Sequence, residues 1–572
     1  MAPQDVSLNS PIRALSGVER LKEGSRRLRG DLAAELAAPG LQVTEDGYNL
    51  LKFHGSYEQY DRDSATARKQ RGEEKEYQFM LRVRMPGGIL TAGQYLALDG
   101  LADEYGNGSM RITTRQGVQF HGIIKGNLKA TVAAINATLL TTQAACGDVV
   151  RNVMSTPRPL RDVRHTRLVQ DARLLSDRLL PASRAYHQIF LDEPDSSQAG
   201  GDAGEEFEPL YGSTYLPRKF KIAIATPDDN SVDVFANDLG FIALFEGDVL
   251  RGYNVTVGGG FGMTHNRKDT YPRAADVVGF VAAHELLTAA EAVIRLQRDH
   301  GDRGDRKRAR LKYVVDDRGL DWVRTELRTT YGLNLQPLAA MPAIEIPELL
   351  GWHNQGDGQL WLGVPLPSGR IVDDGNVRLR TALRDIVTRF GPDPVMTPQQ
   401  DVLLTNIKPA DRAAIERILR AANVKLSEDL TPLARWALAC PALPTCGLAL
   451  TEAERVRAPL VEIFEGMLRR HGLIEERISL RITGCPNGCA RTYAGDIGIV
   501  GRVPGAYAIY VGGDFAGTRL SFKLHERVKE DHLAATLEPV VARFAAERQA
   551  GEGFGDFCHR IGPEALLATA EH

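Results

Sequence analysis

LRVRMPGGIL (residues 81–90) returns in weaker form as LGVPLPSGRI (362–371), and RITTRQGVQFHGI (111–123) lies on VMTPQQDVLLTNI (395–407) without a gap. A segment with helical periodicity precedes the second stretch in both halves of the chain. The pattern predicts two copies of a strand–helix–strand unit. A fainter match, between residues 221–243 and 478–501, extends the repeat and indicates a duplicated ancestor.

Four cysteines occur only in the later copy: Cys440 and Cys446 in ACPALPTCG, and Cys485 and Cys489 in TGCPNGCAR. They offer four thiolates at C-x5-C and C-x3-C spacing, and the second pair lies in a Gly/Asn/Pro loop with exposed backbone N–H groups. These features favour an iron–sulfur cluster. Zinc sites usually begin each pair as C-x2-C or C-x4-C, so structural zinc is the alternative, and two disulfides are a weaker one.

Composition limits the class of protein. Six cysteines in 572 residues, no apolar h-region at the N-terminus and no apolar run of membrane-spanning length predict a cytoplasmic protein in a reducing compartment. With 70 Lys plus Arg against 73 Asp plus Glu, a general nucleic-acid or membrane binder is disfavoured. Cys146 and Cys558 have no partner at ligand spacing and are interpreted as ordinary thiols.

The first half carries positive charges in strand-like segments. Arg82 and Arg84 alternate with apolar residues and are predicted to share one strand face, as are Lys219 and Lys221. RITTRQGVQFHG is interpreted as a long strand whose polar face carries Arg111, Thr113, Arg115, Gln119 and His121. An ordinary amphipathic strand would turn such a stripe to water, and periodicity alone does not exclude this.

The second repeat offers an internal control for these charges. The positions of Arg84, Arg111, Arg115 and His121 are taken there by Pro365, Val395, Gln399 and Thr405. The strand pattern persists where the charge does not. The charges are therefore dispensable for the fold and are predicted to serve a site.

Together with the cysteines, these residues resemble a family: the siroheme-containing sulfite and nitrite reductases, and within it the hemoprotein (beta) component of assimilatory sulfite reductase. The resemblance covers nearly the whole chain. The motifs that carry it are RVRMPGG (82–88), RITTRQGVQFHG (111–122), RNVMST (151–156), LPRKFK (216–221), GGGFGMTH (258–265), RLKY (310–313), both cysteine motifs and GEGFGDF (551–557).

The resemblance implies roles for matching positions. Cys440, Cys446, Cys485 and Cys489 would hold a 4Fe-4S cluster, and Cys489 would also bridge to the siroheme iron. The implied substrate-binding residues are Arg84, Arg151, Lys219 and Lys221, and the implied siroheme contacts are Arg111, Thr113, Arg115, Gln119 and, as a further basic contact, Lys312. His121 is interpreted as a structural or carboxylate partner, because the family uses the cysteine sulfur as the axial iron ligand.

The resemblance also implies an α+β fold, internally duplicated, in which ferredoxin-like half-domains pair with two larger α/β domains. The predicted boundaries are 76–147 and 346–425 for the half-domains, 148–345 for a first siroheme- and substrate-binding domain, and 426–572 for the cluster- and siroheme-binding domain. Residues 1–75 are predicted to be an arm that docks a partner, and a helix packed on its own domain is the alternative.

The implied reaction is the six-electron reduction of sulfite to sulfide for sulfur assimilation and cysteine biosynthesis. VTVGGGFGMTH (255–265) is the nearest match to a dinucleotide fingerprint, but Met263 replaces the third glycine and no apolar helix follows. Electrons must therefore come from a partner, which the resemblance implies is either a flavoprotein (alpha) component with FAD and FMN that uses NADPH, or ferredoxin. Nitrite reductase on the same fold is one alternative function, disfavoured by Lys221, and a non-catalytic iron–sulfur or zinc protein is another.

Overall fold

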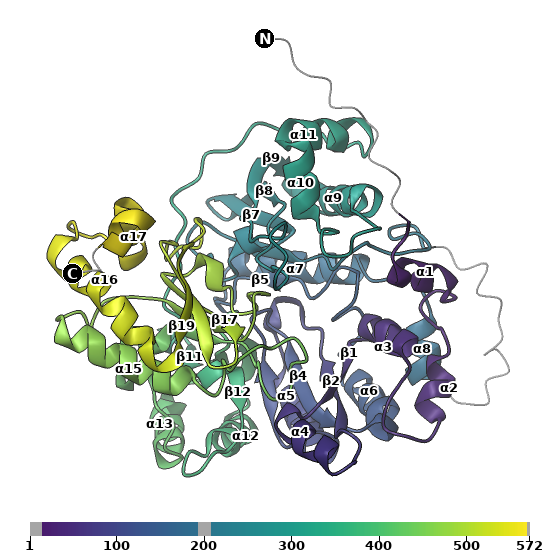
Figure 1. The fold of residues 1–572 in the computed structure, drawn as a ribbon, viewed down its shortest axis with the longest axis horizontal. Helices are drawn as coiled ribbons and strands as arrows, with labels where there is room; N and C mark the ends of the chain where they lie inside the picture. Colours follow the sequence, from purple (N-terminus) through teal and green to yellow (C-terminus); the bar gives the residue numbers. More distant parts are fainter. Residues whose placement is uncertain (1–13, 193–207, 569–572) are drawn as a thin grey trace, which may run out of the picture.

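The computed structural model describes residues 14–192 and 208–568, which form four β-sheets surrounded by helices (Figure 1). Residues 1–13, which belong to the predicted arm, lie outside the described residues. In the part of the chain that the structure describes, every helix is too short or too polar to cross a membrane.

The two sequence repeats form two smaller sheets in the lower part of Figure 1. The first sheet has the order β1 (Ser56–Tyr60), β2 (Tyr77–Arg82), β4 (Val118–Ile123), β3 (Met110–Ile112), β12 (Arg370–Ile371), with helices α4 (Arg62–Gln70), α5 (Ala92–Glu104) and α6 (Leu128–Ala137). The second has the order β10 (Gly351–Asn354), β11 (Leu360–Val364), β14 (Val402–Ile407), β13 (Asp393–Met396), with α12 (Leu379–Phe390) and α13 (Arg412–Ala421). The predicted strand–helix–strand unit is therefore present twice.

The two half-domain sheets exchange short segments with each other. β12 of the second repeat pairs with β3 of the first, and Ile89 of the first repeat pairs with Val395 of the second. The exchange needs glycine at related positions, because a Cβ on Gly88 would lie 2.3 Å from the Met396 carbonyl oxygen and one on Gly369 would lie 2.4 Å from that of Ile112. The repeat thus fixes how the halves join.

The two larger sheets share one topology, in which two parallel pairings are followed by two antiparallel ones. One sheet runs β5 (Met154–Ser155), β6 (Ile222–Ala225), β7 (Leu239–Glu246), β8 (Val249–Val257), β9 (Asp276–Ala282). The other runs β15 (Ala437–Ala439), β16 (Leu480–Thr483), β17 (Ile497–Val503), β18 (Ala506–Val511), β19 (Phe522–Lys529). The duplicated α+β fold predicted from the sequence is confirmed.

Helices accompany each larger sheet. Beside β5–β9 lie α7 (Val163–Arg178), α9 (Leu286–His300), α10 (Leu311–Arg318) and α11 (Leu320–Thr329). Beside β15–β19 lie α14 (Pro432–Arg435), α15 (Arg457–Arg470), α16 (Leu533–Glu547), α17 (Phe554–Ile561) and α18 (Pro563–Leu567). Of these, α15, α16 and α17 are seen at the left of Figure 1.

The segment predicted as one long polar strand is instead a hairpin. β3 ends at Ile112 and β4 begins at Val118, and the turn between them closes through the Gly117 carbonyl, which accepts the Thr113 N–H at 2.8 Å. Gln116 has φ of 57°, a left-handed conformation that a continuous strand does not contain. Side-chain alternation therefore does not run through residues 113–117.

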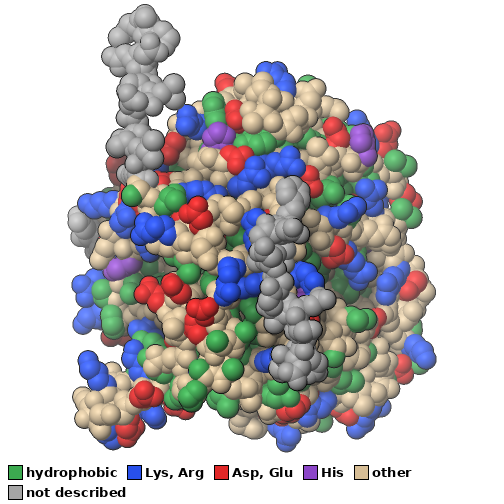
Figure 2. All heavy atoms as spheres, turned by 90° about the vertical axis from the view of Figure 1, so that its right-hand side faces the viewer, with side chains coloured by type: hydrophobic (Ala, Val, Ile, Leu, Met, Phe, Trp, Pro, Cys, Tyr) green, Lys and Arg blue, Asp and Glu red, His purple; other side chains and the backbone are tan. Residues whose placement is uncertain are grey.

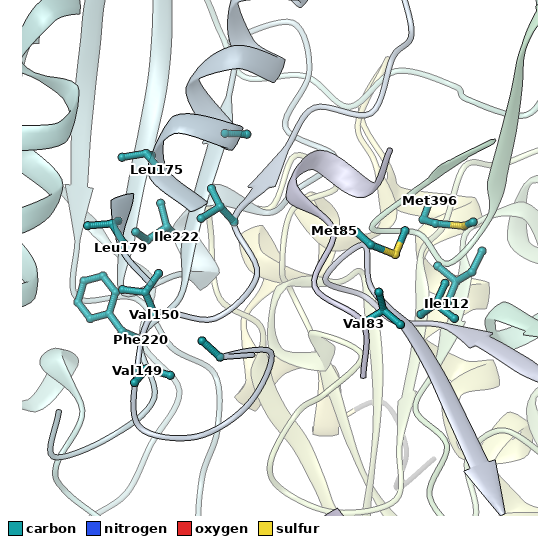
Figure 3. Close-up of a cluster of buried hydrophobic side chains, with 14 of the residues drawn as sticks. Val83, Met85, Ile112, Val149, Val150, Leu175, Leu179, Phe220, Ile222 and Met396 are labelled. Atoms are coloured by element: carbon teal, nitrogen blue, oxygen red, sulfur yellow. The ribbon is translucent and has the colours of Figure 1, made fainter. Parts of the chain in front are cut away.

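One hydrophobic core joins both half-domains to the β5–β9 sheet. Figure 3 shows Val83, Met85, Ile112 and Met396 where the two half-domains meet, with Val150 and Phe220 further along the same core. The sheet β15–β19 and its helices have a separate core, which includes Phe464, Phe544 and Phe557. The C-terminal lobe thus packs as a unit against the rest of the chain.

The N-terminal segment is packed on the body of the protein, together with α8 (Ala185–Phe190). It contains α1 (Gly17–Gly24), α2 (Leu32–Ala37) and α3 (Glu45–Leu51). Lys22 of α1 is 1% exposed, and its Nζ donates to Glu19 Oε1 at 2.5 Å and to the Leu216 carbonyl at 2.7 Å. On the face that carries these helices, positive and negative side chains intermix (Figure 2). The described part of the arm is therefore packed on the body of the protein, and its docking of a partner stays a prediction.

The predicted boundary of the arm also needs correction. β1 lies inside residues 1–75, yet it pairs with β2 in register from Ser56↔Leu81 to Tyr60↔Tyr77. Its backbone hydrogen bonds make it an edge strand of the first half-domain, so the arm ends before Ser56.

Candidate metal centre and anion site

The four cysteines follow strands of the C-terminal sheet. Cys440 comes directly after β15, while Cys485 and Cys489 lie in the loop after β16. Because β15 and β16 are parallel neighbours, their carboxyl ends lie at one edge of the sheet and bring the two cysteine motifs together. Cys440 and Cys485 are buried, Cys446 is half-buried and Cys489 is exposed.

The thiols affect one another electrostatically. Burial raises the pKa of the Cys440 thiol well above its usual range, and the nearby Cys489, Cys485 and Cys446 add to the rise. Burial likewise raises the pKa of Cys485 to about 12, with Cys489 as the next contribution. Four neighbouring thiols, three of them buried or half-buried, whose ionisation is mutually unfavourable need a positive centre to become thiolates. The set has the chemistry of metal ligands.

Hydrogen-bond donors face these sulfurs. The Gly484 N–H donates to Cys440 Sγ at 3.3 Å, and Asn487 Nδ2 donates to Cys485 Sγ at 3.5 Å. Among the described residues, no three Cys, His, Asp or Glu side chains gather closely enough to hold a single metal ion. A cluster distributes its ligands over several irons, and four neighbouring thiols with hydrogen-bond donors at two of their sulfurs suit it.

A group of cations lies beside the exposed cysteine. Burial lowers the pKa of Lys221 well below its usual range, with Arg115 and Arg310 as the next causes, whereas Cys489 is near enough to oppose the shift. Burial lowers the pKa of Lys219 in the same way, and Arg218, Lys221, Arg151 and Arg310 add to it. The members of this cation cluster are Arg82, Arg115, Arg151, Arg218, Lys219, Lys221 and Arg310.

The cation cluster is incompletely compensated. Arg310 donates to both oxygens of Asp238, at 3.0 and 2.6 Å, and Arg218 lies 3.9 Å from Asp148. Within the described residues, no hydrogen bond or ion pair of the side-chain ammonium of Lys219 or Lys221 is found, and the Nε atoms of Arg82 and Arg115 are buried without a partner. Cations in this state favour a bound anion.

Arg84, predicted to bind substrate, lies outside this cluster. Its guanidinium donates to Ser176 Oγ at 3.0 Å, to the Ser176 carbonyl at 3.0 Å and to the Val150 carbonyl at 2.9 Å. Arg82, two residues earlier, lies near Arg115 and donates to Cys146 Sγ at 3.2 Å. The two arginines face different surroundings because β2 ends at Arg82. Arg82 is therefore the residue of this segment that the fold brings to the site.

Most of the expected siroheme contacts already have protein partners. Arg111 donates to Glu454 Oε2 at 3.2 Å, Thr113 Oγ1 accepts the Arg115 N–H at 3.2 Å, and Gln119 donates to Met80 Sδ at 3.3 Å. Among the predicted siroheme contacts, Arg115 differs because it belongs to the cation cluster and its Nε has no partner.

Lys312 is fully buried beneath the glycine loop. Its Nζ donates to the carbonyls of Gly260 and Gly262, at 3.0 and 2.9 Å, and also to that of Tyr271. All three ammonium protons are thereby occupied, so Lys312 holds the loop rather than reaching into the site.

His121 is buried, with Nδ1 3.2 Å from Gln59 Oε1 and Nε2 without a partner. Burial lowers its pKa well below the usual range, so the ring is neutral. Its interpretation as a structural or carboxylate partner stays a prediction.

Sequence reasoning also missed Arg218 and Arg310. Both lie in motifs that were singled out, LPRKFK and RLKY, next to residues that were chosen. The sequence feature that could have indicated both residues is the local density of positive charge. It could not show which side chains point into the site.

The two halves of the chain meet at the Cys489 loop. Thr114, in the turn between β3 and β4, donates from Oγ1 to the Cys489 carbonyl at 3.0 Å, and the Met263 N–H of the glycine loop donates to the Pro486 carbonyl at 3.0 Å. Related positions of the repeat also pair: Arg491, with φ of 57°, lies 2.6 Å from Asp233, with φ of 46°. Cations of one repeat and thiols of the other thus share one site.

Two family models match this arrangement. The nitrite and sulphite reductase 4Fe-4S domain matches residues 170–335 and 434–572, and the nitrite/sulfite reductase ferredoxin-like half domain matches residues 70–138 and 353–422. The chain belongs to the nitrite and sulfite reductase family. Each model matches twice, as a duplicated chain requires.

Members of this family are similar over nearly the full length. The sulfite reductase [NADPH] hemoprotein beta-component of Myxococcus xanthus is 48% identical over 550 residues, 96% of this chain and 97% of that protein. The sulfite reductase [ferredoxin] of Synechococcus elongatus is 44% identical over 572 residues, 97% of this chain and 91% of that protein. The solved structure of the Mycobacterium tuberculosis NirA protein superposes with a TM-score of 0.78 at 25% identity, covering 96% of this chain and 97% of that one.

Membership of this family gives the chain a 4Fe-4S cluster and a siroheme as cofactors. The residues described above fit both groups. The four thiols suit the cluster, and the Nε atoms of Arg82 and Arg115, which lack a partner within the cation cluster, suit a macrocycle that carries many carboxylates.

Proposed function

We propose that the chain is the hemoprotein subunit of an assimilatory sulfite reductase, which reduces sulfite to sulfide by six electrons. The observation that carries the proposal is the position of Lys221, which lies in the cation cluster and also within electrostatic reach of Cys489. A small dianion bound by these cations would sit against the metal centre.

In this proposal Cys440, Cys446, Cys485 and Cys489 would hold the cluster, and Cys489, the exposed thiol, would also serve the siroheme. When bound, the coupled siroheme and cluster supply electrons at the substrate sulfur. Arg115 and Arg82 have donors that can pair with siroheme carboxylates.

The lysines and Arg151 bind the substrate and manage its protons. Each oxygen that leaves sulfite needs protons to become water. Burial and the neighbouring cations lower the pKa of Lys219 and Lys221, which makes their ammonium groups better proton donors once an anion is bound. Arg151, whose guanidinium stays charged at any working pH, orients the anion.

The substrate is tested with the Lys221→Asn variant of the holoenzyme. We expect kcat/KM for sulfite to fall by about 100-fold, because a charged donor to the dianion is lost, and kcat/KM for nitrite, a monoanion, to fall less. Lys268→Asn, at an exposed lysine, is the control. Equal losses on both substrates would remove Lys221 as the source of selectivity. A purified wild-type protein that holds zinc but no siroheme or iron would end the proposal and favour the non-catalytic alternative.

The electron donor is proposed to be a flavoprotein that takes electrons from NADPH. Support comes from the hemoprotein relatives that are 47 to 48% identical, whereas the ferredoxin-named relative is 44% identical. Turnover of sulfite with NADPH and a flavoprotein component from such a relative should exceed turnover with reduced ferredoxin. Faster turnover with ferredoxin would reverse this assignment. The reducing partner and six cysteines free of disulfides fit a cytoplasmic location.

A further inference from the structure

Arg62, from the N-terminal side of the chain, reaches the first cysteine loop, 384 residues away from Cys446 in sequence. Its backbone N–H donates to the Pro444 carbonyl at 3.2 Å. Its Nη1 donates to the Cys446 carbonyl at 3.1 Å and to the Ala449 carbonyl at 2.6 Å. One residue therefore makes three hydrogen bonds to the loop that contains a cluster ligand.

The position of Arg62 is itself well fixed. Arg62 is the first residue of α4, whose start is capped by the Asp61 side chain, which accepts the Asp63 N–H at 2.8 Å. The neighbouring Asp63 makes an ion pair with Arg455 at 2.5 Å, which ties α4 to the C-terminal lobe a second time.

The cysteine loop depends on such outside support. Residues 440–450 form no helix or strand, and Cys446 is held inside the loop by its own N–H, which donates to the Ala442 carbonyl at 2.9 Å. The Ala449 N–H closes the turn on the Cys446 carbonyl at 3.2 Å. Arg62 Nη1 donates to the carbonyls at both ends of this turn and so fixes the distance between them.

Arg62 also places a positive charge beside Cys446. Both side chains are half-buried, which limits screening by solvent. Reduction adds an electron to a cluster, so a fixed cation near one of its ligands stabilises the reduced form.

We propose that Arg62 is a positioning residue of the metal centre: it holds the Cys446 loop in its ligating conformation and raises the reduction potential of the cluster. The inference rests on the proposed function in one respect, that the four cysteines hold a 4Fe-4S cluster.

The test compares Arg62→Ala, Arg62→Lys and Arg68→Ala holoproteins with the wild type. Arg68 lies on the same helix, and its Nε donates to the Glu74 carbonyl at 2.7 Å, away from the cysteine loop, so it is the matched control. Two quantities are measured: the rate of iron release to a chelator, and the midpoint potential of the cluster in an EPR-monitored redox titration.

Arg62→Ala should release iron about tenfold faster than the wild type and should show a more negative midpoint potential, because support and charge are both lost. Arg62→Lys keeps the charge, but its side chain is one atom shorter and reaches the two carbonyls less well, so iron release should rise while the potential stays near that of the wild type. Arg68→Ala should match the wild type in both. A folded Arg62→Ala protein that never loads iron, beside a loaded Arg68→Ala protein, would also support the proposal.

Equal iron release and equal potentials in Arg62→Ala and Arg68→Ala would overturn it. A wild-type protein that contains no cluster would instead show that the proposed function has failed, so the two failures are distinguishable.

Discussion

Arg82 and Arg84 stand two positions apart and alternate with the same apolar residues, yet the structure gives them different roles. Arg84 is 2% exposed, and its guanidinium donates to three backbone carbonyls and one hydroxyl. These neutral acceptors satisfy its hydrogen-bond donors without a carboxylate. Arg82 keeps a buried nitrogen without a partner and lies among other cations. Arg84 therefore stabilises the fold, and Arg82 is available to an anion.

Two substitutions separate these roles. Arg84→Gln should lower the free energy of unfolding by about 2–4 kcal/mol, since it leaves buried carbonyls unpaired. Arg82→Gln should leave stability within about 1 kcal/mol of the wild type, because few of its contacts are lost. It should instead weaken sulfite binding to the holoenzyme by about tenfold. Urea unfolding followed by circular dichroism, and sulfite titration followed by absorbance, measure the two effects. The opposite assignment would be supported if Arg84→Gln alone impaired sulfite binding.

At this scale the sequence predicted types of residue better than individual ones. The four cysteines and the lysines of LPRKFK lie where a metal and an anion would be bound. They could be singled out from the sequence because dense positive charge and grouped thiols have few structural uses. The choice between Arg82 and Arg84, and the role of Lys312, depend on where a strand ends and which carbonyls lie nearby. Neither is visible in side-chain alternation.

Between elements, a buried ionic network joins α1 to the segment that carries the substrate lysines. Asp148 is 1% exposed, receives two hydrogen bonds from Arg306 at 2.6 and 2.9 Å, and lies 3.7 Å from Lys22. The Leu216 carbonyl accepts from Lys22, and the Leu216 N–H donates to the Asp148 carbonyl at 3.1 Å. Asp148 thereby fixes the start of LPRKFK.

This network gives the protein an acid-sensitive component of stability. Burial alone would raise the pKa of Asp148, but Arg306 and Lys22 outweigh it and hold that pKa well below the usual range. A carboxyl with a depressed folded-state pKa stabilises the fold above its unfolded pKa of about 3.9, and this contribution is lost as the pH falls further. Asp148→Asn should therefore cost about 3 kcal/mol at pH 7, since charged partners stay buried.

The pH dependence distinguishes this ionic contribution from a loss of packing. The urea midpoints of wild type and Asp148→Asn, measured at pH 7, 5, 4 and 3 with equal cofactor content, should begin to draw together below about pH 4, where the carboxyl of the unfolded chain is protonated, and the gap should close only as the pH approaches the much lower folded-state pKa. A gap that stays constant over this range would mean that the charge of Asp148 is not the source of its effect.

Elements with strong periodicity were predictable, and irregular ones were not. Both strand–helix–strand units could be located from the sequence because the same apolar pattern occurs in both copies of the repeat. The hairpin at residues 113–117 was missed because its polar residues continue the alternation of β3 and β4, although the turn interrupts the strand. Only Gly117 hinted at it. The N-terminal strand β1 was missed because its partner, β2, lies beyond a helix.

For the whole molecule, the duplication explains both architecture and division of chemistry. The two larger sheets have the same strand order, yet one half supplies thiols and the other cations. A shared site between two halves requires that they join in one fixed orientation. The exchanged segments at Gly88 and Gly369 fix this orientation. Gly88 of the first repeat packs against the Met396 carbonyl of the second, and Gly369 of the second packs against the Ile112 carbonyl of the first.

The joint can be tested by adding one methyl group on each side of it. Gly88 and Gly369 have φ of 77° and 72°, and an added Cβ would also collide with the Met396 or Ile112 carbonyl. Gly72 has the same φ of 72° but nothing within 4 Å, so Gly72→Ala measures backbone strain alone. We expect Gly72→Ala to cost about 1 kcal/mol and Gly88→Ala and Gly369→Ala to cost more than about 2 kcal/mol each in urea unfolding.

Because the two collisions lie at equivalent ends of one interface, the costs of Gly88→Ala and Gly369→Ala should be similar. If either cost no more than Gly72→Ala, the halves would not be held by close backbone contact at that point, and the orientation that brings Lys221 to Cys489 would have to come from the seam of Asp233 and Arg491 instead.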